Sequence, residues 1–267
     1  MPVFLFPGQG SQRSDTAKQF YEVSTGARAV FDQVIPLLPE DVASVLFEGS
    51  QEALSHTCNA QPVLLCVEMA IAAHLDSLGI HPELCAGHSL GEITAFVVAG
   101  AIPVEAVVPF VLERARVMSE NVPEGGMAAV LGLPPEEIEA ALAAGTQVAN
   151  YNGPAQTIIS GDAASLAASI KKLKEKGARR VMPLQVSGPF HSPYMQSAAE
   201  SLGKYLEAMP IYKPGVPVLS SVTGACEEEP ERIRTLLARQ LYAPVQWTSV
   251  MAQLSDRKAV EVGPGTT

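Results

Sequence analysis

The sequence predicts an α/β protein in which one large subdomain carries a smaller inserted one. Short apolar runs typical of buried strands alternate with helical patterns over the first 122 residues, which indicates a parallel sheet covered on both faces. The order of elements changes to βαββαβ over 124–187 and changes back afterwards. A chain of 267 residues with 47% hydrophobic content is long enough for a large core and a second, smaller one.

The first part of the chain is expected to supply alternating strands and helices. A continuous apolar run at 3–6, closed by Pro7 and Gly8, predicts a buried strand. Weak helical patterning covers 16–37, and a strong helical pattern covers 60–79 and ends at a glycine. The remaining elements expected here are a strand at 83–87, a helix at 90–100 and a helix at 103–122 that Pro109 should kink.

Residues 124–187 are expected to form the small subdomain, and 1–123 together with 188–267 the large one. The predicted elements of the small subdomain are strands at 127–133, 146–153, 156–161 and 179–186, and helices at 134–145 and 162–177, the second capped by Asp162. Their order is that of the ferredoxin-like unit. The large subdomain should resume with a loop at 187–195, helices at 196–208 and 230–241, and strands at 216–224 and 258–263.

Composition excludes several classes of function. The net charge of −10 argues against a protein that binds nucleic acid or an anionic membrane surface. The four cysteines show no C-x-x-C spacing, so neither a metal site nor a disulfide framework is expected, and a reducing, cytoplasmic compartment is favoured. The N-terminus lacks the basic region of a signal peptide, and no apolar run reaches the length of a membrane span.

Residues 87–91, Gly-His-Ser-Leu-Gly, match the pattern G-x-S-x-G and place Ser89 between an apolar strand and a helix. A sharp strand-to-helix turn holds such a serine clear of the sheet, with the positive end of the helix directed at it. The alternative is a tight turn with an N-capping serine. The strand before and the helix after favour a nucleophile.

A serine nucleophile needs a base, and the chain has only five histidines. Four are set aside by position: His56 in a polar stretch, His74 in an amphipathic helix, His81 in a turn, and His88 beside the serine, where neighbouring strand side chains point to opposite faces. His191 remains, in a rigid Gly- and Pro-containing loop where the chain re-enters the large subdomain, and we favour it as base over a structural histidine. No Asp or Glu stands out as a third member, and a carbonyl could hold the other ring nitrogen instead.

The Gly-rich segment 7–12 follows the first strand. It fails as a dinucleotide fingerprint because Arg13 stands where a third glycine is required, and no cofactor is expected. A loop of this kind at a strand end can instead offer backbone N–H groups to a developing oxyanion.

Several segments together resemble the malonyl-coenzyme A:acyl carrier protein transacylase family, including the standalone trans-acting acyltransferases of polyketide synthases. They occur in order over nearly the whole chain: FPGQGSQ, GHSLGE, LERARVM, EGGMAAVLGL, VANYNGPAQTIISG, VSGPFHSPYM, RQLYAPVQW and EVGPG. The resemblance implies an α/β-hydrolase-like large subdomain that carries a ferredoxin-like small one, which agrees with the order of predicted elements.

The resemblance also implies roles for catalytic residues. Ser89 resembles the acylated nucleophile and His191 the base. Gln9 and Leu90 match the positions whose backbone N–H groups form the oxyanion hole. Gln240 matches the residue whose main-chain carbonyl holds the histidine, which would account for the absence of an acid.

Two further residues resemble those that bind the acyl group. Arg114 matches the residue that clamps the free malonyl carboxylate, and a guanidinium can meet a carboxylate with two hydrogen bonds. The alternative is an arginine on a helix surface, which we expect of Arg116. Phe190, directly before the base, resembles the phenylalanine of malonyl-selective members.

The activity implied is transfer of a malonyl group from malonyl-coenzyme A to the phosphopantetheine thiol of an acyl carrier protein, through a malonyl-serine, for fatty-acid or polyketide synthesis. Three alternatives stay open: a hydrolase that clears acyl groups from carrier proteins, a transferase for another acyl group, and a non-enzymatic subunit that only docks a synthase. A carboxylate clamp argues against the first, and the intact set of site residues against the last.

One basic cluster is a candidate docking site for the acidic carrier protein. Residues 171–180 contain six of the 18 basic side chains, namely Lys171, Lys172, Lys174, Lys176, Arg179 and Arg180. A local positive patch can steer an acidic partner even when the whole chain is acidic. The alternative is stabilisation of a helix C-terminus on a solvated face.

Overall fold

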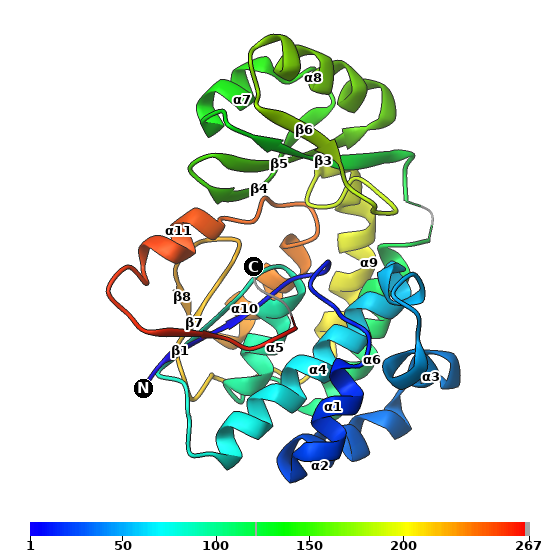
Figure 1. Ribbon diagram of the computed structural model, residues 1–267, viewed down its shortest axis with the longest axis vertical. Coiled ribbons are helices and arrows are strands. Elements are labelled where there is room, and N and C mark those ends of the chain that lie inside the picture. The colour runs from blue at the N-terminus through cyan, green and yellow to red at the C-terminus, as the bar shows by residue number, and fades with distance from the viewer. Residues whose placement is uncertain (121, 265–267) are drawn as a thin grey trace.

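The computed structural model describes residues 1–120 and 122–264 and shows a mixed α/β protein with two separate sheets (Figure 1). The first sheet has five strands in the order β8-β7-β2-β1-β9. Its strands are β1 (Val3–Phe6), β2 (Leu84–Gly87), β7 (Val218–Leu219), β8 (Cys226–Glu227) and β9 (Ala259–Glu261). The pairs β9–β1, β1–β2 and β2–β7 are parallel, and β8 is antiparallel to β7.

Helices pack around this first sheet. They are α1 (Thr16–Val23), α2 (Thr25–Val34), α3 (Glu40–Glu48), α4 (Thr57–Ser77), α5 (Leu90–Val98), α6 (Val104–Val117), α9 (Gln196–Glu207), α10 (Pro230–Arg239) and α11 (Trp247–Ala252), with 3₁₀ turns at Ile35–Leu37, Ala53–Ser55 and Pro193–Met195. Alternate side chains of β1 divide between the two faces: Phe4 and Phe6 join the main core with α4, α5 and α6, while Val3 packs with Val250 of α11. Both faces of the parallel sheet are therefore covered, as the sequence predicts.

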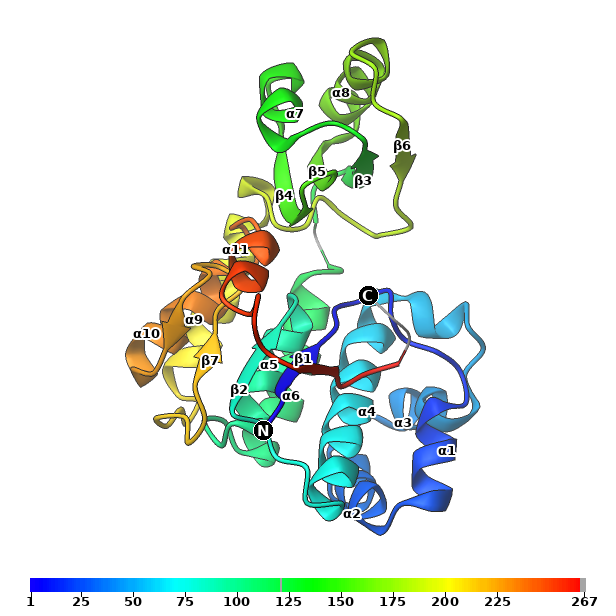
Figure 2. The same cartoon turned by 60° about the vertical axis from the view of Figure 1, so that its left-hand side comes forward.

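The second sheet is antiparallel, with strand order β4-β5-β3-β6. Its elements follow the chain as β3 (Gly125–Leu131), α7 (Pro135–Ala141), β4 (Thr146–Gly153), β5 (Gln156–Asp162), α8 (Ala163–Glu175) and β6 (Arg180–Pro183). The two helices cover the outer face, and the other face is turned toward the rest of the molecule (Figure 2). Met127, Ala129 and Ile158 from that inner face join the main core. As expected, Asp162 caps α8 by accepting hydrogen bonds from the N–H groups of Ala164 and Ser165.

Several predicted boundaries are wrong. The strand expected at 216–224 is only Val218–Leu219, because the chain turns back after it: Ser220 accepts a hydrogen bond from the N–H of Gly224, which has a φ of 69°. Helix α6 ends at Val117 rather than at 122, and position 121 of that predicted helix lies outside the described residues. Helices α3 and α11 are not among the predicted elements. Both are short: α3 buries only Val42 and Leu46, and α11 buries only Val250.

One expectation from the sequence is wrong: among the described residues, helix α4 is long and apolar enough to cross a membrane, and it is the one helix that is. Of its most apolar stretch, 72% is buried against other parts of the protein. Its apolar residues are therefore used as core, in contact with α2, α5 and α6.

Candidate active site

Ser89 lies in the sharp turn between β2 and α5, with φ 53° and ψ −106°. Two glycines permit this turn. A Cβ at Gly87 would lie 2.0 Å from the carbonyl carbon of Gly91, and a Cβ at Gly91 would lie 2.1 Å from the carbonyl oxygen of Phe6. The glycines of the G-x-S-x-G pattern are thus explained by close packing of the turn against its own helix and against β1. The backbone strain of the turn is located at Ser89.

The backbone groups predicted to form an oxyanion hole lie at the same sheet edge. Leu90 is the first residue of α5, where N–H groups have no acceptor within the helix. Phe6 and Gly87 are paired at the ends of β1 and β2, so the loop after β1 begins beside the serine turn. Gln9 in that loop lines the same pocket as Ser89 and Leu90, and its side chain donates to Thr57 Oγ1 at 3.2 Å.

The structure brings His191 to the serine: its Nε2 lies 3.0 Å from Ser89 Oγ. Its Nδ1 is 2.8 Å from the carbonyl oxygen of Gln240 and 3.3 Å from that of Ala243. Both carbonyls are acceptors, so Nδ1 carries the proton and Nε2 is free to accept one from the serine. No carboxylate contacts this imidazole among the residues that the structure describes.

The backbone of His191 is held as firmly as its ring. With a φ of 56° it adopts a left-handed conformation that is uncommon outside glycine. Its N–H donates to the carbonyl oxygen of Leu241 at 2.9 Å, and its own carbonyl accepts from Nε2 of Gln147, on β4, at 3.0 Å. The second sheet therefore contributes directly to the placement of this histidine.

The pKa of His191 is lowered to about 3. Burial is the largest cause, and the positive charge of Arg114 adds to it, followed by that of His88. The imidazole is consequently neutral at physiological pH, which is the form that can take a proton from a serine hydroxyl.

Arg114 is a buried cation beside the serine, with only 1% of its surface exposed. One terminal nitrogen donates to Gln61 Oε1 at 2.5 Å, and the other donates to Gln240 Oε1 at 2.8 Å and to Ser89 Oγ at 3.2 Å. Burial lowers its pKa to about 10, against the opposing influence of Glu92, so the guanidinium stays charged at neutral pH. Its Nε is buried without a hydrogen-bond partner.

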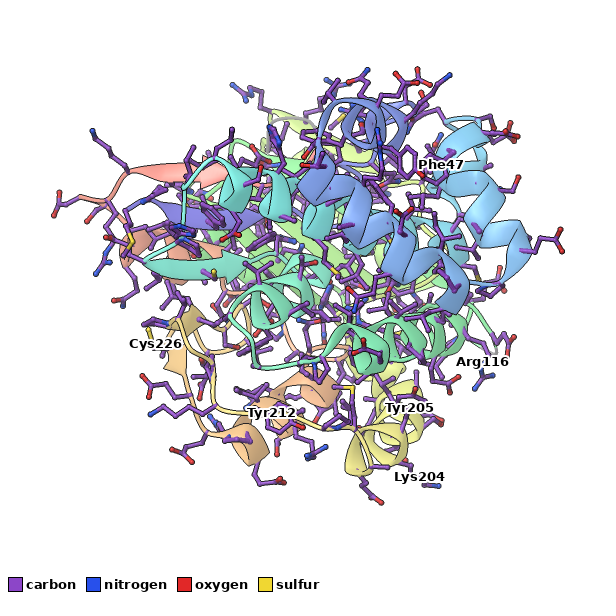
Figure 3. The ribbon with its side chains drawn as sticks, turned by 90° about the horizontal axis from the view of Figure 1, so that it is seen from below. Phe47, Arg116, Lys204, Tyr205, Tyr212 and Cys226 are labelled. Atoms are coloured by element: carbon purple, nitrogen blue, oxygen red, sulfur yellow. The ribbon has the colours of Figure 1, made fainter. Side chains whose placement is uncertain are left out.

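Arg116, two residues further along α6, is the surface arginine that the sequence analysis expects. It is half-exposed (Figure 3) and forms ion pairs with Glu113 on its own helix and with Glu120 just beyond the helix end. A position two residues along a helix faces a different side, so one arginine enters the core and the other does not.

A pocket of about 100 Å³ lies between the two sheets over these groups. Its lining comprises Gln9, His88, Ser89, Leu90, Arg114, Met118, Met127, Asn150, Ile158, Leu184, Val186, Phe190 and His191. Phe190 is buried in its wall, next to the histidine. A larger groove of about 600 Å³ between α6 and α9, beside Lys204 and Tyr205, contains none of these groups, so volume alone does not identify the site (Figure 3).

Three polar residues that the sequence analysis missed take part in this arrangement: Gln61, Glu92 and Gln147. Gln61 and Glu92 are completely buried or nearly so, and both contact the network around Arg114. Polar residues inside helices have no distinctive sequence signal, although Gln61 and Glu68 stand among mostly apolar buried side chains in α4. Burial raises the pKa of Glu92, while hydrogen bonds from Ser221 and Gln240 lower it.

His88, which the sequence analysis set aside, is bonded elsewhere. Its Nε2 lies 3.0 Å from Asn152 Oδ1, and burial lowers its pKa. The neighbouring side chains of His88 and Ser89 thus take different partners, and the serine is left to His191.

The six basic residues of the predicted docking patch are all exposed at the end of α8 and the start of β6. Two are in long ion pairs, Lys171 with Glu175 at 4.0 Å and Lys176 with Glu137 at 3.9 Å. Residues Leu184 and Val186, just beyond β6, line the pocket. The patch and the pocket are therefore joined by one short strand.

Known proteins resemble this chain in sequence and in fold. Residues 3–265 match the family described as acyl transferase domain. A malonyl CoA-acyl carrier protein transacylase of Bacillus subtilis is 41% identical over 274 residues, covering 98% of this chain and 86% of that protein. An acyl carrier protein S-malonyltransferase from Vibrio cholerae superposes with a TM-score of 0.93 at 35% identity, covering 98% of this chain and 90% of that one.

A further solved structure contains a type II PKS acyl-carrier protein in complex with its malonyl-transacylase. The match has a TM-score of 0.93 at 34% identity and covers 98% of this chain and 89% of that one. Similarity in sequence and in fold thus extends over almost the whole chain. The chain belongs to the acyl transferase family and, within it, to the malonyl-coenzyme A:acyl carrier protein transacylases.

Proposed function

We propose that this protein transfers a malonyl group from malonyl-coenzyme A to the phosphopantetheine thiol of an acyl carrier protein. The observation that carries the proposal is a buried, charged arginine 3.2 Å from a serine hydroxyl that also lies 3.0 Å from a neutral histidine. Ser89 and His191 suit acyl transfer through a covalent intermediate. Arg114 suits an acyl group that carries its own carboxylate.

In the first half-reaction, His191 Nε2 takes the proton of Ser89 Oγ as the oxygen attacks the thioester carbonyl. The negative charge that develops on the carbonyl oxygen is held by the backbone N–H groups of Gln9 and Leu90. The carbon–sulfur bond then breaks, and His191 returns its proton to the coenzyme A thiolate. Arg114 holds the malonyl carboxylate throughout.

In the second half-reaction, His191 takes the proton of the carrier-protein thiol, and the sulfur attacks the malonyl-serine. The bond from Ser89 Oγ to the acyl carbon breaks, and the proton passes to the serine. The carbonyl of Gln240 keeps Nδ1 protonated in both halves, so Nε2 takes up the proton as base and releases it from the imidazolium as acid. The narrow apolar pocket favours an oriented thiol over water.

We also propose the finer architecture: an α/β-hydrolase-like subdomain of 1–123 and 188–267, and a ferredoxin-like subdomain of 124–187. The separate antiparallel sheet, with its own apolar cluster under α7 and α8, supports this division. We also propose a cytoplasmic location, because the reaction uses substrates that are found in the cytoplasm.

The decisive experiment is intact-mass analysis of the protein after incubation with malonyl-, acetyl- and methylmalonyl-coenzyme A, followed by addition of carrier protein. Malonyl transfer requires a malonyl adduct that persists in buffer and disappears on addition of holo carrier protein. An adduct that is lost to water at the same rate without carrier protein would support the hydrolase alternative.

We expect malonyl-coenzyme A to be preferred over methylmalonyl-coenzyme A. Phe190 is buried in the pocket wall beside His191, where its ring leaves little room for an α-methyl group. One methyl group is worth roughly 1–3 kcal/mol, so the preference should be about tenfold or more. Direct competition between the two thioesters measures it, and equal kcat/KM values would contradict the role given to Phe190.

We propose the basic patch at 171–180 as the carrier-protein docking site. Reversing two of its charges, Lys174→Glu with Arg179→Glu, should raise KM for carrier protein and make it less sensitive to salt, while acylation by malonyl-coenzyme A is unchanged. Lys204→Glu, on α9, is the matched control and should leave KM unchanged. An unaltered KM for the double variant at low salt would place docking elsewhere.

A further inference from the structure

Glu92 is a buried acid close to the reacting groups that the mechanism above does not use. It lies in the first turn of α5, three residues after Ser89, with 1% of its surface exposed. It does not line the pocket and makes no contact with His191. Its Oε2 accepts hydrogen bonds from Gln240 Nε2 at 2.6 Å and from Ser221 Oγ at 2.5 Å.

Three contacts act together on the direction of the Gln240 amide, and the one to Glu92 is the shortest. A carboxylate only accepts hydrogen bonds, so it must face the amide nitrogen. The same nitrogen donates to the carbonyl oxygen of Ser89 at 3.0 Å. The amide oxygen is left facing Arg114, from which it accepts at 2.8 Å.

Gln240 therefore joins the acyl-binding arginine to the catalytic turn. Its side-chain oxygen and Gln61 Oε1 are the two amide acceptors that hold the guanidinium of Arg114. If the Gln240 amide were reversed, its NH₂ would face the guanidinium and its oxygen would face the carbonyl of Ser89. Both contacts would be repulsive, and one of the two amide supports of Arg114 would be lost.

We infer that Glu92 is a positioning residue for malonyl recognition: by holding the amide nitrogen of Gln240, it helps to keep the guanidinium of Arg114 aligned for the substrate carboxylate. This inference rests on the proposed function. It makes Glu92 a determinant of the preference for a carboxylated acyl group, although no atom of Glu92 touches that group.

The test is Glu92→Gln, which keeps the shape of the side chain but removes the charged acceptor that holds the amide nitrogen of Gln240. The rate of serine acylation would be measured with malonyl- and acetyl-coenzyme A by intact mass. We expect kcat/KM for malonyl-coenzyme A to fall about tenfold or more, which is the usual cost of losing a hydrogen bond to a charged group. The kcat/KM for acetyl-coenzyme A should change much less. In an Arg114→Ala background, Glu92→Gln should cause no further loss with malonyl-coenzyme A.

Ser221→Ala is the matched control. It removes the other hydrogen bond to the same oxygen of Glu92 and leaves the bond from Gln240 in place, so the ratio of malonyl to acetyl rates should not change. An equal fall with both thioesters, a loss that persists without Arg114, or an unchanged ratio in Glu92→Gln would each overturn the inference. Failure of the wild-type protein to form any malonyl adduct would instead refute the proposed function itself.

Discussion

Ser89→Ala is expected to abolish the malonyl adduct on the protein completely. Its hydroxyl is the one that lies 3.0 Å from His191 Nε2, in a turn that exposes it to the pocket. Without the oxygen, no acyl-enzyme bond can form, and transfer to carrier protein should fall by several orders of magnitude, since loss of a nucleophile costs about 10⁶-fold in well-studied hydrolases. Mass spectrometry of the intact protein after exposure to malonyl-coenzyme A is the measurement.

Two nearby serines serve as controls for that result. Ser187 lies in the loop before His191, where its Oγ is 3.1 Å from Thr57 Oγ1. Ser192 follows the histidine, and its hydroxyl is buried and donates to the carbonyl of Pro189. Ser187→Ala and Ser192→Ala should both keep the adduct. A stable malonyl adduct on the Ser89→Ala protein would show that another residue is acylated.

Arg114→Ala should remove malonyl transfer while activity on acetyl thioesters is kept or increased. A malonyl carboxylate in a closed pocket without its cation loses a charge-assisted pair, at a cost on the order of 2–5 kcal/mol. That cost corresponds to a fall of at least tenfold in kcat/KM for malonyl-coenzyme A. An acetyl group has no carboxylate to leave unpaired, so its rate should not follow. The measurement is the acylation rate with each thioester.

Arg116→Ala provides the matched control on the same helix. This side chain is half-exposed, and surface ion pairs like those with Glu113 and Glu120 contribute little to stability. Malonyl transfer should therefore be unchanged in that variant. If Arg114→Ala lowered malonyl and acetyl rates by the same factor, the arginine would be a structural residue and the carboxylate clamp would be wrong.

Local sequence was sufficient wherever neighbouring residues decide the structure. The turn at Ser89 could be predicted because the steric reasons for Gly87 and Gly91 lie within one pentapeptide and the strand beside it. The order of strands and helices in 124–187 was likewise predicted, since each element has its own periodicity and its own glycine or proline boundary. The cap at Asp162 is equally local.

Long-range packing decided the rest of the site. His191 was selected by elimination among five histidines, but its 3.0 Å approach to a serine 102 residues away depends on how the two sheets meet. Its Nδ1 is held by the main-chain carbonyls of Gln240 and Ala243. Every residue has a main-chain carbonyl, so residue types do not reveal which carbonyl will bind Nδ1. Only the family resemblance indicated Gln240.

The same reason explains what was missed. Gln61 and Glu92 lie inside helices, and Gln147 contacts His191 from the other sheet. Their hydrogen bonds form only when segments that are distant in the sequence pack together. The strand at Val218–Leu219 is shorter than predicted for the same reason. An apolar run indicates burial, but it does not show over how many residues a neighbouring strand is present to pair with. Sterics along the chain act between adjacent residues, whereas hydrogen bonds in a buried site join whichever donors and acceptors the fold brings into contact.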